Sequence, residues 1–186
     1  MKYKIVIATT LLLTVGICII GYTQSSSKPS TRAQQREQRH IEREKRRATR
    51  QAEYEKYIDS IVLARNFQFS PQSMEQQPAG NVRLLNNPNF ELSVWGSEVD
   101  IFLPYIKGVT PPYYTVMLNY TLPEVSRYIT EQTQEGWLVT FSSSLFSGSD
   151  YDFTLEIYPA TGSATLTIGS SWYPDVQYSG AISGLN

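Results

Sequence analysis

The stretch Asp150-Tyr-Asp-Phe-Thr-Leu-Glu-Ile157 decides the fold. Large apolar side chains stand at every second position, and acidic or hydroxyl side chains stand between them. Successive side chains of a strand point to opposite faces. The alternation therefore predicts a strand with Tyr151, Phe153, Leu155 and Ile157 in a core, and with the polar positions in water.

The same alternation recurs in both directions from this stretch. The runs are 90–94, 99–103, 114–120, 137–141, 164–168 and 176–182. Turn-forming pairs such as Pro111-Pro112, Glu135-Gly136 and Thr161-Gly162 separate them, with no helical pattern between. We therefore predict an all-β fold, a single antiparallel barrel or sandwich of about eight to nine strands.

Two shorter apolar pieces precede these runs. Residues 67–69 and 82–85 are expected to add a first hairpin. The polar segment between them, residues 70–80, is predicted to be a surface loop, because it contains two prolines and few large apolar residues.

Charge divides the chain. Residues 66–186 carry three basic side chains (Arg83, Lys107 and Arg127) and eleven acidic ones, and they contain neither histidine nor cysteine. Nucleic acid is therefore an unsuitable ligand for this part, because phosphate binding needs concentrated Lys and Arg. The commonest nucleophiles, general bases and soft metal ligands are missing too, so we expect no catalytic site, no metal site and no cofactor.

The N-terminal part has a different character. Lys2 and Lys4 precede an apolar run over residues 5–22, which is the pattern of a secretory signal or, if uncleaved, of a membrane anchor. We divide the chain into a signal peptide or anchor helix (1–25), a basic helical stalk (26–65) and an acidic β domain (66–186). This layout predicts export to the periplasm or cell envelope.

The stalk is rich in helix-forming residues and lacks Gly and Pro from Thr31 to Arg65. Eleven basic and six acidic residues lie between positions 28 and 65. The first half has Ile41 as its only large apolar residue, whereas from Tyr54 onward apolar residues share one face that is expected to dock on the domain. The basic half is either a solvated spacer or a segment that binds a membrane surface or another polyanion.

Two groups of residues in the β domain are candidates for chemistry. Glu98 with Asp100, and Asp150 with Asp152, are carboxylate pairs that each share one face of a strand, as calcium binding or acid–base hydrolysis would require. Their alternation with core positions favours plain solvent exposure. The second group is a set of aromatic residues that can stack on sugars or hold an apolar ligand, or that instead form a rim. They are Tyr113, Tyr158, Trp172 and Tyr173.

An ordered set of motifs resembles a family of exported Bacteroidota proteins, domain of unknown function 4251. The motifs are Asn89-Phe90, Gly96, Val99-x-Ile101-x-Leu103-Pro104-Tyr105, Gly108, Glu135-Gly136-Trp137-x-Val139, Tyr151-x-Phe153-x-Leu155-x-Ile157, Gly162-x-Ala164-x-Leu166 and Tyr178-Ser179-Gly180-x-Ile182. Pro111-Pro112 departs from the family, which tends to be glycine-rich there. The resemblance implies export and a β fold, and it provides no mechanism.

These observations favour a non-catalytic binding or scaffold module of the cell envelope. In one form it holds an apolar or amphiphilic small-molecule ligand, of unknown identity, inside a barrel. The alternative is a carboxylate-based, glycosidase-like hydrolase that uses the acidic residues of the β domain. A purely structural protein of the envelope is a further alternative. Convergence of the carboxylates in one cleft would favour the hydrolase.

Overall fold

The computed structural model describes residues 31–78, 80–108, 114–144 and 150–185. The apolar run near the N-terminus and Tyr113 lie outside these residues. Within the described part of the chain, no helix has the length and apolarity needed to cross a membrane. The chain divides into two compact units, and the boundary falls between Lys45 and Arg46.

Helix α2 (Thr31–Leu63) begins at Thr31 and has three buried residues, Ile58, Ile61 and Val62, all close to its C-terminal end. These residues pack into the core of the β domain. Polar contacts add to the docking, because Trp137 Nε1 donates to Asp59 Oδ1 at 2.7 Å and the Gly184 amide donates to Tyr57 Oη at 2.8 Å. The docked end of the helix is therefore part of the unit Arg46–Asn186.

The ten strands found in the described residues form one antiparallel sheet. They are β1 (Asn66–Gln76), β2 (Arg83–Leu84), β3 (Glu91–Trp95), β4 (Glu98–Lys107), β5 (Tyr114–Leu122), β6 (Ser126–Gln132), β7 (Trp137–Ser144), β8 (Asp150–Tyr158), β9 (Ser163–Ser170) and β10 (Val176–Gly184). Their order is β5-β4-β3-β1-β10-β9-β8-β7-β6, and β2 pairs only with β1. The all-β prediction is confirmed.

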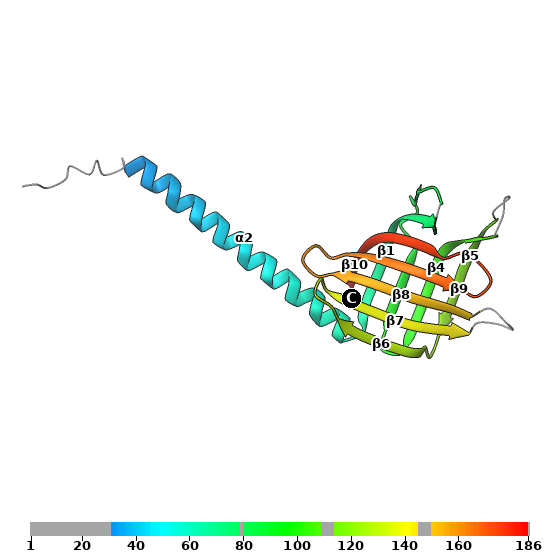
Figure 1. The fold of residues 1–186 in the computed structure, drawn as a ribbon. Coiled ribbons are helices and arrows are strands. Elements are labelled where there is room, and N and C mark those ends of the chain that lie inside the picture. The colour runs from blue at the N-terminus through cyan, green and yellow to red at the C-terminus, as the bar shows by residue number, and fades with distance from the viewer. Residues whose placement is uncertain (1–30, 79, 109–113, 145–149, 186) are drawn as a thin grey trace, which may run out of the picture. The chain divides into compact units, whose positions relative to one another are not determined.

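The sheet curls into a half-barrel, so that β6 to β10 lie across β1, β3, β4 and β5 (Figure 1). The concave face carries the core, with the strand Tyr151 to Ile157 buried at alternate positions as predicted. The two walls are joined inside, because Tyr178 Oη of β10 donates to the Pro104 carbonyl of β4 at 2.7 Å. The half-barrel is open along one side, between the edge strands β5 and β6.

The prediction of a surface loop at residues 70–80 is wrong for residues 70–76, which belong to a strand. β1 continues to Gln76 and pairs with β10 from Phe67 to Gln76, with a register shift between Pro71 and Ser73. Pro71, Met74 and Gln76 are buried. A bulge accommodates the proline, so the polar composition of this segment conceals a central strand.

Candidate ligand-binding site

The inward face is less well covered at the two edge strands than in the middle of the sheet. Val116 and Tyr120 of β5 and Tyr128 of β6 point inward but are only half-buried, whereas Leu155 of β8 and Leu166 of β9 are fully buried. The register supports these directions, because Tyr120 lies opposite the buried Ile101. The inward face is therefore partly exposed along these two edge strands.

Three buried hydroxyl oxygens near this open side have no hydrogen-bond partner among the described residues. They belong to Tyr120, Tyr128 and Ser143. Ser143, on β7, is only 4% exposed. Buried polar groups in folded proteins nearly always have a partner, so each exception needs an explanation such as water, an ion or a ligand. We call these three residues the hydroxyl cluster.

Aromatic rings connect the members of the hydroxyl cluster. Tyr128 stacks on Phe141, with ring centroids 5.8 Å apart, and Ser143 follows two positions later on the same face of β7. Ser143 lies opposite Tyr151 of β8. Tyr151 in turn contributes to the raised pKa of Tyr120, which places the two phenol groups near each other. Tyr128 thus lies against Phe141, and Tyr120 and Ser143 both lie near Tyr151.

Burial keeps the interior phenols protonated. It raises the pKa of Tyr105, Tyr120 and Tyr178 well above the usual tyrosine value, and neighbouring phenols raise each of them further. Burial also raises the pKa of Tyr128 to about 12, although the nearby Arg65 charge and the Thr130 side chain beside the hydroxyl oppose this shift. These groups are therefore hydrogen-bond donors and acceptors at neutral pH, and they are not anions.

Arg65 adds a charge beside Tyr128 of the hydroxyl cluster. It follows the end of α2 and is half-buried, and its Cζ lies 4.1 Å from the centroid of the Tyr128 ring. Sequence reasoning did not single out Arg65 or any residue of the hydroxyl cluster. Alternation indicated that Tyr120 faces the core, but only the sheet order shows that its strand is an edge.

The predicted aromatic candidates do not form one site. Tyr158 ends β8 and pairs with Ser163, whereas Tyr173 and the exposed Trp172 follow β9 at its opposite end, about 20 Å away at the usual rise per residue. Lys107 Nζ lies 5.5 Å from the centroid of the Tyr173 ring. Tyr113 lies outside the described residues.

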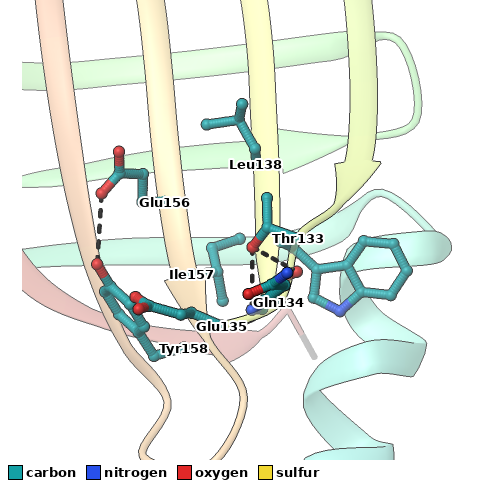
Figure 2. Close-up of a pocket in the computed structure, with 9 residues that line it drawn as sticks. Thr133, Gln134, Glu135, Leu138, Glu156, Ile157 and Tyr158 are labelled. Atoms are coloured by element: carbon teal, nitrogen blue, oxygen red, sulfur yellow. Dashed lines mark hydrogen bonds between the residues drawn. The ribbon is translucent and has the colours of Figure 1, made fainter.

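Tyr158 lines a pocket of about 260 Å³ beside the β6–β7 turn (Figure 2). Its hydroxyl donates to Glu156 Oε2 at 3.3 Å, and the Gly136 amide donates to Thr133 Oγ1 at 3.1 Å. A Cβ at Gly136 would stand 2.0 Å from the Ile157 carbonyl oxygen, so this turn requires glycine. Glu135 and Glu156, which also line this recess, are both exposed.

The predicted carboxylates are not brought together. Glu98 and Asp100 of β4 face outward beside the exposed Trp95, in a hollow of about 460 Å³. Asp152 of β8 is also exposed, and accepts a hydrogen bond from Ser142 Oγ at 2.7 Å. Four strands separate β4 from β8 in the sheet order, and the backbone of Asp150 begins β8. No group of three or more His, Cys, Asp or Glu side chains in the described residues is arranged to hold a metal ion.

The fold and this interior define an all-β, half-barrel protein with a helix docked at one end. The model of the family described as domain of unknown function 4251 (DUF4251) matches residues 49–182. The chain belongs to this family, and the resemblance noted in the sequence is confirmed. The matched region begins within α2, before the docked residues Ile58, Ile61 and Val62.

A crystal structure of a DUF4251 family protein from Bacteroides eggerthii is similar to this chain, with a TM-score of 0.56 and 16% sequence identity. The match covers 72% of this chain and 91% of that chain. At this identity the similarity shows a shared fold alone. None of the curated proteins matches.

Proposed function

We propose that this protein is a non-catalytic binding module of the cell envelope, and that it holds one small amphiphilic molecule on the open side of the half-barrel. The observation that carries the proposal is the hydroxyl cluster of Tyr120, Tyr128 and Ser143, three buried oxygens without a partner in the described residues. A ligand with a polar group would satisfy them and offset the cost of their burial.

The surroundings of the hydroxyl cluster favour an amphiphile over a fully polar molecule. Phe141 and Phe153 stack with ring centroids 4.7 Å apart, and Val139 and Leu155 are fully buried nearby on the same two strands. Ligand sites of this kind combine a mostly apolar lining with a few placed polar groups. A molecule with an apolar body and one polar end matches that combination.

The placement of ionisable groups supports binding over catalysis. The candidate carboxylates Glu98, Asp100 and Asp152 are exposed on the convex face, away from the hydroxyl cluster. The interior phenols have pKa values raised further from neutrality. General acid–base catalysis works best with groups whose pKa lies near the operating pH, and the phenols depart from that condition.

The envelope location rests on the apolar run at residues 5–22 and the two lysines before it. The basic half of α2 is proposed to contact anionic lipid head groups, because every residue from Thr31 to Tyr54 is exposed and the segment is rich in arginine. Cosedimentation of the full chain with phosphatidylglycerol vesicles, but not with phosphatidylcholine vesicles, is the expected result. Equal binding to both would contradict it.

Native mass spectrometry of the full chain, purified without denaturant from its own envelope, tests the binding proposal. We expect one small molecule per chain, retained under native conditions and released on denaturation. A measured mass equal to that of the polypeptide alone, together with a thermal stability that is unchanged after extraction with organic solvent, would overturn the proposal.

A further inference from the structure

Arg65 stands in an unusual backbone conformation at the junction between α2 and β1. Its φ is 50°, in the left-handed region where helices usually end with Gly or Asn. A side chain larger than Asn is rarely placed there, because it adds a steric cost. The chain nevertheless has arginine at this position, and the guanidinium lies over Tyr128 inside the edge of the half-barrel.

Among the residues that the structure describes, the Arg65 charge has no ion-pair partner. No carboxylate of the described residues lies within ion-pair distance of its guanidinium, although residues 66–186 carry eleven acidic side chains. The Arg65 side chain is half-buried. A partly buried cation without an anion loses hydration and gains little in return, so a site of this kind favours an anionic partner.

Two buried polar atoms without a partner at hydrogen-bond distance in the described residues lie next to this cation. They are Tyr128 Oη, on the ring that the guanidinium covers and with the Thr130 side chain near it, and Asn66 Oδ1, an acceptor on the residue that follows Arg65. The Tyr128 hydroxyl stays protonated at neutral pH because its pKa is about 12. A guanidinium and a phenol O–H together supply the donors that a carboxylate head group accepts.

We propose that the ligand of the open side is an amphiphile with an anionic head group, of the long-chain carboxylate class, and that Arg65 and Tyr128 bind this head group. The inference rests on the proposed function. In this arrangement the Arg65 guanidinium pairs with the carboxylate, the Tyr128 hydroxyl donates to it, and the apolar chain extends along Phe141 toward Ser143 and Tyr120.

A matched pair of fluorescent probes tests the charge requirement. The probes are 11-(dansylamino)undecanoic acid and its uncharged methyl ester, titrated into the full chain at mildly alkaline pH. We expect the acid to bind about tenfold more tightly than the ester, as one charge-assisted hydrogen-bonded pair would produce. Arg65→Gln is expected to reduce acid binding about tenfold and to leave ester binding unchanged. Arg65→Lys keeps the charge and should retain part of the difference.

Lys107→Gln is the control variant. Lys107 is also a half-buried cation over a tyrosine ring, but it lies at the C-terminal end of β4. Arg65 lies near the other end of this strand, because the Gly96 amide donates to the Arg65 carbonyl just before β4 begins. The Lys107→Gln substitution should leave both affinities unchanged. The melting temperature of each variant, measured without probe, shows whether it is folded, and Arg65→Lys maintains the test if Arg65→Gln does not fold.

The outcomes separate the two proposals. Binding of both probes with equal affinity would leave the interior binding site in place and would overturn the anionic head group. Binding of neither probe would count against the interior site itself. A loss of acid binding in Lys107→Gln as large as in Arg65→Gln would overturn the assignment of the head group to Arg65.

Discussion

Two interior tyrosines differ in whether their hydroxyl has a hydrogen-bond partner, and this difference decides how removal of each hydroxyl changes the stability of the protein. Tyr178 Oη donates to the Pro104 carbonyl at 2.7 Å, whereas Tyr120 Oη has no partner among the described residues. An unsatisfied buried hydroxyl costs stability, and a satisfied one contributes it. We expect Tyr178→Phe to lower the free energy of unfolding by about 1–2 kcal/mol and Tyr120→Phe to raise it by about 1 kcal/mol in the ligand-free protein.

Urea denaturation of the two variants at neutral pH measures both changes, each in the absence of ligand. Tyr120→Phe is further expected to weaken ligand binding, so that stability and binding change in opposite directions. If Tyr120→Phe destabilised the protein as much as Tyr178→Phe, the Tyr120 hydroxyl would have a partner in the ligand-free state, and this part of the account would be incorrect.

The raised pKa values of the interior phenols also predict how the stability of the protein changes at alkaline pH. Burial raises the pKa of Tyr128 to about 12 and raises those of Tyr120 and Tyr178 well above the usual value. Because the folded-state pKa exceeds the unfolded one, stability is fully present below about pH 10 and is lost as the pH rises toward 12. The part of the tyrosinate absorbance that comes from these buried phenols should therefore rise together with unfolding. Ionisation of these tyrosines near pH 10 in the folded state would contradict the burial.

At the scale of elements, α2 depends on a small apolar contact. Ile58 is fully buried against the sheet, whereas Ile41 of the same helix is 45% exposed. Removing a buried isoleucine side chain leaves a cavity, so Ile58→Ala should cost about 2–4 kcal/mol. Ile41→Ala should change stability by less than about 0.5 kcal/mol. Thermal or urea unfolding distinguishes them, and equal effects would mean that the helix does not stabilise the domain through this face.

Several elements could be predicted from the sequence, for physical reasons. Strict alternation in β8 gave its inward face correctly, and the apolar residues after Tyr54 gave the docked end of α2. β6 was not predicted, because Arg127 has a φ of 55° at a register shift and interrupts the alternation around Tyr128. Residues 70–80 were assigned to a loop because polar side chains and Pro71 conceal a paired strand.

At the scale of the whole molecule, the candidate site depends on which strands are neighbours. Tyr120 and Tyr128 lie eight positions apart in sequence, but their strands are the two unpaired edges of the sheet. Pairing of β1 with β10 joins strands β5, β4 and β3 on one side to strands β9, β8, β7 and β6 on the other, so that they form one sheet. Alternation reports local direction alone, so the sequence did not indicate an open side, a hydroxyl cluster or the position of Arg65 over Tyr128.

A high-resolution crystal structure of the protein purified without denaturant tests the central claim most directly. We predict continuous density on the open side between β5 and β6, within hydrogen-bond distance of Tyr120 Oη or Ser143 Oγ and in contact with the rings of Phe141 and Tyr128. Density that is accounted for by isolated water molecules on these hydroxyls, or by a protein side chain that fills the space and bonds to them, would contradict a ligand-binding role for the half-barrel.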